Sequence, residues 1–100
     1  NSVKRAVTVE LIQEIVSDYY SISKGDLCSN KRDHRIAFPR QVAMYLCRGL
    51  TEATYEDIGA SFGGKHYSTV IHAVDKIMTD IELNTELNGI VSDLSNRIRE

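Results

Sequence analysis

The 100-residue sequence has little of what marks several classes of protein: one proline, six glycines, two cysteines and no tryptophan. Such scarce glycine and proline exclude a collagen-like or low-complexity chain, and a 42% hydrophobic content excludes a disordered one. The longest apolar run, Val42–Cys47, is far too short to span a membrane. Cys28 and Cys47 do not make a disulfide scaffold, and we expect no signal peptide. We therefore expect one globular domain in the cytoplasm.

Patterns typical of enzymes, metal sites and cofactor sites are also missing. The segment Gly59–His66 matches G-x-x-x-x-G-K, but His66 stands where a phosphate-binding loop needs Ser or Thr, and a helical pattern precedes it instead of a strand. The cysteines and histidines are scattered, without the paired spacing of a zinc site. No Ser, Cys or Thr has the setting of a nucleophile. We expect no catalysis, no metal and no cofactor in this domain.

The formal net charge of −2 hides an uneven distribution of charge along the chain. Between Asn30 and Leu50 the net charge is +4, whereas the remaining residues carry −6. Five cations make up this basic stretch: Lys31, Arg32, Arg35, Arg40 and Arg48. A local basic stretch on an acidic domain gives the molecule a side suited to a polyanion, although it is also compatible with an ordinary solvated loop.

Apolar residues recur at helical spacing, and no convincing strand is found, so the sequence predicts an all-α domain. Residues 1–7 are expected to form a tail, and residues 8–100 to form one domain. The stretch from Ser29 to Phe38 is expected to be a loop, with Pro39 in the first turn of the third helix. Six helices are predicted, at Thr8–Tyr20, Ser23–Leu27, Pro39–Leu50, Tyr55–Phe62, His66–Glu82 and Leu87 to the C-terminus.

The segment Glu56–Lys76 has the layout of a helix-turn-helix. A short helix with Gly59 is followed by the Gly63–Gly64 turn and then by a longer amphipathic helix. A small residue lets the two helices cross closely, and the second helix presents its free face to the major groove of DNA. The same pattern also occurs in ordinary helix pairs whose polar face meets water.

Several segments together resemble one family. The run Phe62–Ala73, F-G-G-K-H-Y-S-T-V-I-H-A, resembles the signature F-G-G-R-D-H-[ST]-T-V-[LI]-H-A of the C-terminal DNA-binding domains of the DnaA family of bacterial replication initiators. Lys31–Leu46 resembles the basic loop and following helix of that family, and Thr54–Gly59 resembles its S/T-x-x-E-I-G segment. The resemblance covers the chain from about Thr8 onward and implies a six-helix, Trp-repressor-like fold.

The resemblance also implies which residues bind DNA. Arg32 matches an arginine that enters the minor groove, and Arg40 and Gln41 match a pair that contacts phosphates. Arg48 matches a basic residue that meets the backbone, while Thr54 and Tyr55 lie where main-chain groups approach phosphate. The major-groove readers would be the residues at the start of the second helix: Lys65, His66, Tyr67, Ser68 and Thr69.

Three of these readers depart from the family pattern, because Lys65-His66-Tyr67 replaces the usual Arg-Asp-His. Lysine lacks the fork with which arginine grips guanine, His66 can donate where a carboxylate only accepts, and Tyr67 is bulkier than imidazole. The fold and the groove should survive these changes, whereas the preferred bases need not match those of the family's usual box.

The sequence thus predicts a domain that binds short origin boxes in double-stranded DNA during initiation of chromosome replication. It would act near the nucleoid, as a monomer in isolation, with oligomerisation and any ATPase module in other segments. Two alternatives stay open: a helix-turn-helix of a repressor or transposon-associated protein, and an acidic helical module that binds a protein.

Overall fold

The computed structural model describes residues 6–100, so most of the predicted tail, residues 1–7, lies outside the described part. Six helices occur in this order: α1 Val9–Tyr20, α2 Lys24–Leu27, α3 His34–Leu50, α4 Tyr55–Ser61, α5 Tyr67–Leu83 and α6 Thr85–Arg99. No strand occurs in residues 6–100, which confirms the predicted all-α class.

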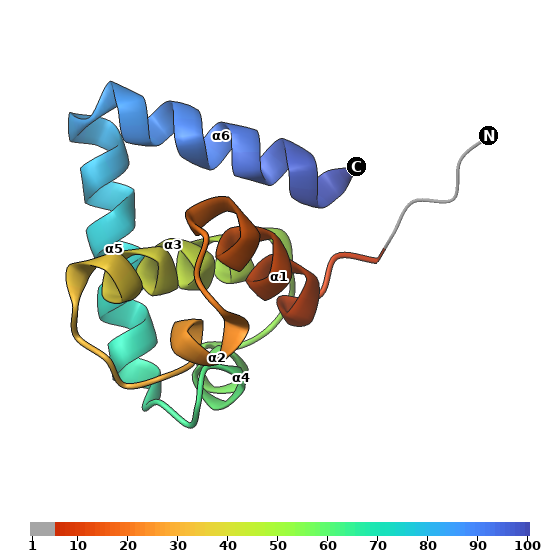
Figure 1. Ribbon diagram of the computed structural model, residues 1–100, viewed down its shortest axis with the longest axis vertical. Coiled ribbons are helices and arrows are strands. Elements are labelled where there is room, and N and C mark those ends of the chain that lie inside the picture. The colour runs from red at the N-terminus through yellow and green to blue at the C-terminus, as the bar shows by residue number, and fades with distance from the viewer. Residues whose placement is uncertain (1–5) are drawn as a thin grey trace.

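Helix α3 is the centre of the packing, since every other helix contacts it (Figure 1). Helix α1 lies along one side of α3, and α6 lies across the end of α5. The core between them is apolar, with Ile12, Val42, Phe62 and Ile77 all fully buried. Burying each such side chain contributes about 1.5–3 kcal/mol, which holds the helices in one arrangement.

Side chains cap the starts of α1, α2, α4 and α6, and the first three caps lie where the sequence pattern indicates. Helix α6 begins at Thr85, two residues before the predicted Leu87. Thr8 Oγ1 accepts from the Leu11 amide at 3.1 Å, and Ser23 Oγ from the Asp26 amide at 3.0 Å. Thr54 and Asp57 cap α4 reciprocally, at 3.0 and 3.2 Å. Asn84 ends α5 and caps α6, so the two helices meet at a single residue. These caps satisfy amide groups that the first turn of a helix leaves unpaired.

The third helix begins earlier than predicted. It starts at His34, so Pro39 lies inside it and the loop before it ends at Asp33. Packing outweighs the proline: Ile36 is buried, and Phe38 makes an edge contact with Tyr20 at 6.5 Å between ring centroids. The prediction that residues up to Phe38 form a loop, with Pro39 in the first turn, was wrong.

The helix-turn-helix is confirmed, with α4 and α5 joined by residues 62–66. Gly59 makes the close crossing possible, because a Cβ there would lie 2.2 Å from the Lys65 carbonyl oxygen. Gly63 and Gly64 have φ angles of 88° and 76°, a region that glycine adopts without strain. The Lys65 amide donates to the Gly59 carbonyl at 2.8 Å, which fixes the turn.

Candidate nucleic-acid interface

The first turn of α5 presents polar side chains to solvent, and His66 caps it. The Ser68 amide donates to His66 Nδ1 at 3.2 Å, and Ser68 Oγ lies 2.8 Å from the same nitrogen. Because Nδ1 accepts, a neutral His66 ring carries its proton on Nε2, so that edge of the ring is a donor. Tyr67 stacks on the His66 ring at 4.4 Å and is 45% exposed. The predicted readers His66, Tyr67, Ser68 and Thr69 therefore form one continuous surface at the start of α5.

The start of α4 lies beside this surface. Thr54, Tyr55 and Tyr67 line a shared hollow of about 320 Å³ between the two helices. The Arg48 guanidinium lies 4.5 Å from the centre of the Tyr55 ring and donates to the Ala53 carbonyl at 3.2 Å. The structure thus brings Arg48, Thr54 and Tyr55 together next to Tyr67, and their predicted contacts with the DNA backbone stay predictions.

The basic loop, residues 28–33, lies on the other side of the start of α5 (Figure 1). Arg32 is exposed, as a residue that enters a groove must be. Lys31 forms an ion pair of 2.9 Å with Asp26. The contact between loop and turn is direct, because Lys65 Nζ donates to the Ser29 carbonyl at 2.8 Å.

Arg40 is held inside the molecule instead of projecting from it, with 8% of its surface exposed. Its Nε donates to the Leu27 carbonyl at 2.8 Å and its Nη1 to the Lys31 carbonyl at 3.0 Å. Its Nη2 reaches the Asp26 carbonyl and Ser29 Oγ, both at 3.4 Å. Burial lowers the pKa of Arg40, while the guanidinium stays charged at physiological pH. The predicted phosphate contact of Arg40 stays a prediction, and four of its five N–H donors already have protein acceptors.

Lys65 is likewise turned toward the protein. Its Nζ donates to three carbonyl oxygens: those of Phe62 at 2.6 Å, Ser29 at 2.8 Å and Cys28 at 3.4 Å. Three bonds use all the donors of an ammonium group. Desolvation, reinforced by the charge of Arg40, lowers the pKa of Lys65. Base reading by Lys65 stays a prediction, but its side chain points away from the surface formed by His66 and Tyr67.

A groove of about 230 Å³ separates α3 from α5 next to the basic loop. Gln41, Thr69 and His72 line it, together with Arg40 and Lys65. His72 and Thr69 are both exposed. His72 was not among the predicted binding residues, although its spacing of three from Thr69 places both on one helix face.

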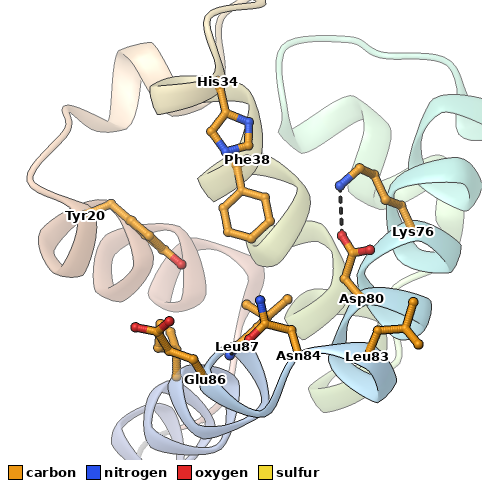
Figure 2. A pocket seen from close by; sticks show the side chains of 10 residues that line it. Tyr20, His34, Phe38, Lys76, Asp80, Leu83, Asn84, Glu86 and Leu87 are labelled. Carbon is orange, nitrogen blue, oxygen red and sulfur yellow. Dashed lines mark hydrogen bonds and ion pairs between the residues drawn. The ribbon is translucent and has the colours of Figure 1, made fainter.

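A larger cavity, of about 620 Å³, lies at the opposite end of α5 (Figure 2). His34 stacks on Phe38 at 5.2 Å, and Lys76 Nζ pairs with Asp80 at 2.8 Å. Tyr20 Oη is buried there and has no hydrogen-bond partner among the described residues. Because Asp80 neutralises Lys76, this cavity adds no net positive charge to the surface formed by the basic loop and the start of α5.

Within residues 6–100, no three Cys, His, Asp or Glu side chains gather as a metal site would require. None of the helices in this part of the chain has the length and apolarity needed to cross a membrane.

The fold and the site define the class of helix-turn-helix proteins. The features that define it are a helix pair joined by a glycine turn, a polar first turn on the second helix, and an adjoining basic loop.

Comparison with known proteins identifies the family within this class. The family model of the bacterial dnaA protein helix-turn-helix matches residues 9–77. The chain is 43% identical over 97 residues to the chromosomal replication initiator protein DnaA of Treponema denticola, covering 97% of this chain and 21% of that protein. It is 48% identical over 90 residues to the DnaA protein of Lactobacillus delbrueckii subsp. bulgaricus, covering 90% of this chain and 20% of that protein. The chain therefore belongs to the bacterial DnaA helix-turn-helix family.

A solved structure has the same fold. A crystal structure of a DNA replication initiation factor superposes with a TM-score of 0.82 at 31% identity, covering 90% of this chain and 27% of that one. The chain spans about a fifth of the length of the curated relatives it matches.

Proposed function

We propose that this chain is the part of a replication initiator that binds short origin boxes in double-stranded DNA. The match to the DnaA helix-turn-helix supports this proposal, as do the relatives named as chromosomal replication initiators. The matched family domain is a helix-turn-helix, which is a binding motif, and no catalysis or cofactor is proposed for it. The protein would act at the nucleoid, where its DNA is found.

The single observation that carries the proposal is the contact between the basic loop and the start of α5. Lys65, the residue before the cap of α5, bonds the carbonyls of Cys28 and Ser29, and Arg32 follows three residues after Ser29. A basic loop and a helix N-terminus that share one surface can engage adjacent grooves of one duplex. The loop would enter the minor groove while α5 enters the major groove.

The division of labour follows from the chemistry of each group. His66, Tyr67, Ser68 and Thr69 would meet base edges in the major groove. His66 would offer Nε2–H to an acceptor such as guanine O6 or N7, because its Nδ1 is used to cap the helix. Arg32 would respond to minor-groove width and to A·T base pairs.

Contacts with the DNA backbone would flank these readers on both sides. Gln41 and His72 line the groove between α3 and α5 and would face one phosphate. Arg48, with the start of α4 at Thr54 and Tyr55, would face the backbone on the other side. Such contacts fix register and carry no sequence information themselves.

So small a surface suits modest affinity as a monomer. Several copies held together through other segments of the full-length protein would then gain avidity on clustered boxes. The repressor and protein-binding alternatives gain no support from the family match.

The test is a titration with the duplex recovered by selection from random sequences, at two salt concentrations. We expect saturable binding that weakens as salt rises, because phosphate contacts release counterions. An absence of binding at low salt would refute a DNA-binding role.

Arg32→Ala tests the minor-groove assignment. It should lower the preference for A·T pairs on the loop side by about fivefold or more, as expected for one lost base-pair contact. Non-specific binding should fall much less. Arg99→Ala, which removes an exposed arginine at the far end of α6, is the matched control and should leave the preference intact (Figure 1). Equal losses on all sequences would contradict the assignment.

A further inference from the structure

We infer that Lys65 and Arg40 are positioning residues that together lock the basic loop against the helix-turn-helix, and that Lys65 sets where Arg32 enters the minor groove without reading a base. This inference rests on the proposed function, since it concerns how the DNA-binding surface is held together. It gives both residues a role different from the direct DNA contacts that the family resemblance implies.

The backbone of the loop turns its carbonyl groups inward. The loop carbonyls of Cys28, Ser29 and Lys31 accept from either Arg40 or Lys65, and Arg40 also bonds the carbonyls of Asp26 and Leu27 at the end of α2. Carbonyl groups in a segment without regular structure need partners when they are buried. Two cations supply these partners, one from within α3 and one from the turn before α5.

Arg40 gives the loop its shape. Its planar fork holds the carbonyls of Leu27 and Lys31 at 2.8 and 3.0 Å, so the end of α2 and the middle of the loop are tied to one guanidinium. Ser29 completes the arrangement, because its hydroxyl donates to the Asp26 carbonyl at 2.6 Å and accepts from the Lys31 amide at 3.2 Å. Arg40 therefore determines the conformation of the residues that precede Arg32.

Lys65 joins the loop, once shaped, to the recognition helix. Its ammonium group bonds the Phe62 carbonyl at the end of α4 and the carbonyls of Cys28 and Ser29 in the loop. One side chain thus bridges the helix-turn-helix and the loop. Lys65 directly precedes His66, and the Ser29 that it bonds lies three residues before Arg32. The distance between the two DNA-contacting regions depends on this bridge.

A second contact confirms that the loop and the turn are closely fitted. A Cβ on Gly63 would lie 2.2 Å from the Cys28 carbonyl oxygen. From α1, Gln13 Nε2 donates to the carbonyl of Ser61, the last residue of α4, at 2.9 Å, and also lies 3.5 Å from Cys28 Sγ. The loop therefore docks on a turn that is itself held in place, and Lys65 provides the polar part of the docking.

Binding measurements on four proteins test this role: the wild type, Lys65→Met, Arg32→Ala and the double variant. Each is titrated with the selected duplex and with two kinds of altered duplex. In one kind the A·T pairs on the loop side are changed to G·C, and in the other the base pairs that face α5 are changed. Lys65→Met should lower the loop-side preference by about as much as Arg32→Ala does, about fivefold or more. The double variant should lose no more than Arg32→Ala alone, because Lys65 acts through Arg32.

Two control variants separate positioning from charge. Lys65→Arg should restore the preference, because a guanidinium can donate to the same carbonyls. Lys24→Met removes one exposed positive charge from the neighbouring helix α2 and should leave the preference unchanged. Lys65→Met could instead change the preference for the base pairs that face α5, with an effect that multiplies that of Arg32→Ala in the double variant. Lys65 would then read a base, and the inference would be wrong. A uniform loss on all duplexes with a flatter salt dependence would overturn it as well.

A measurement on the wild-type chain covers the case in which Lys65→Met does not fold. The Lys65 ammonium protons should give an NMR signal protected from exchange with water, and this signal should persist when the selected duplex is added. A signal that is unprotected in the free chain, or that moves to a DNA contact on binding, would overturn the inference. If the wild type fails to bind any duplex, the proposed function fails while the protected signal still reports on the bridge.

Discussion

At the scale of single residues, two cations are used inside the protein: Arg40 of the basic stretch and Lys65 of the turn before α5. Arg40 and Lys65 have all their nitrogen atoms bonded to protein acceptors, and Lys31 is paired with Asp26. A count of positive charges along the sequence therefore exaggerates what this face offers to phosphates. Arg32, in the loop that Lys65 bonds, and Arg35, in the first turn of α3, are both exposed.

Arg40→Ala provides a test of this distinction. The substitution leaves several loop carbonyls without partners, so the free energy of unfolding should fall by about 2–3 kcal/mol. The salt dependence of DNA binding should keep its slope, because no phosphate contact is lost. Urea unfolding and titrations at several salt concentrations measure the two effects. Arg35→Ala, an exposed neighbour, should show the reverse pattern. A flatter slope with unchanged stability for Arg40→Ala would restore its predicted phosphate contact.

Two buried groups make stability depend on alkaline pH. Burial, with a contribution from the charge of Glu10, raises the pKa of Cys47 from 9.0 to about 12, and burial also raises the pKa of Tyr20. A raised pKa favours the neutral form in the folded state, so unfolding becomes easier once the unfolded chain can ionise. Stability should therefore be full below pH 9 and decline as the pH rises toward 12.

Cys47→Ala checks the source of this decline. Urea unfolding at a series of alkaline pH values should show a shallower loss of stability for Cys47→Ala than for the wild type. The variant should also start lower at neutral pH, because removing a buried sulfur leaves a small void. Tyr20→Phe should reduce the remaining slope near pH 10, the ordinary pKa of tyrosine. An identical pH profile for Cys47→Ala and wild type would show that other groups cause the decline.

At the scale of elements, the two glycines of the turn separate backbone conformation from close contact. Both have positive φ angles, but a Cβ on Gly63 would clash with the Cys28 carbonyl, whereas nothing lies within 4 Å of one on Gly64. Alanine at either site should cost about 1 kcal/mol from the left-handed conformation. Gly63→Ala should cost about 1–3 kcal/mol more because of the clash.

Thermal unfolding of the two alanine variants measures this difference, with Gly64→Ala as the matched control. Gly63→Ala should also weaken the loop-side A·T preference, because the loop must shift away from the turn. Gly64→Ala should bind with the preference of the wild type. Equal stability of the two variants would mean that the loop does not rest on the turn.

The helices were largely predictable because their apolar stripes and caps are local features. Thr8, Ser23 and Thr54 each cap the helix that the pattern places after them. The start of α3 was not predictable in this way. Asp33 makes no side-chain cap, and a proline stands six residues into the helix. Contacts with distant residues, such as that of Phe38 with Tyr20, extend the helix. The local spacing of apolar residues does not reveal such contacts.

The candidate site was predictable in part. The family resemblance places His66 to Thr69 on the exposed start of a helix, where the structure also has them. It cannot show that Arg40 and Lys65 point inward, because all but one of the acceptors that hold them lie 9 to 37 residues away in the chain. Motif matching recovers which residue types occur at a site, whereas the direction of a long side chain depends on the backbone folded around it.

At the scale of the whole molecule, recognition depends on the spacing between two contact regions. Lys65 connects the loop with Arg32 to the start of α5, since its Nζ donates to the Ser29 and Cys28 carbonyls at 2.8 and 3.4 Å, so the two regions should meet DNA as one rigid surface. Two grooves read from a rigid surface require base pairs at a fixed separation. This requirement distinguishes a bridged surface from two independently mobile contacts.

A duplex with one extra base pair between the loop-side and α5-side halves of the selected site tests this rigidity. The insertion moves the halves apart by about 3.4 Å and rotates them by about 35°, so only one can be engaged. Affinity should fall roughly tenfold or more, to that of a duplex with the loop side changed to G·C. Lys65→Met should show a smaller loss on insertion, because its loop is released from the turn. If the wild type binds both spacings equally, the loop moves freely, and the hydrogen bonds of Lys65 do not determine where Arg32 meets DNA.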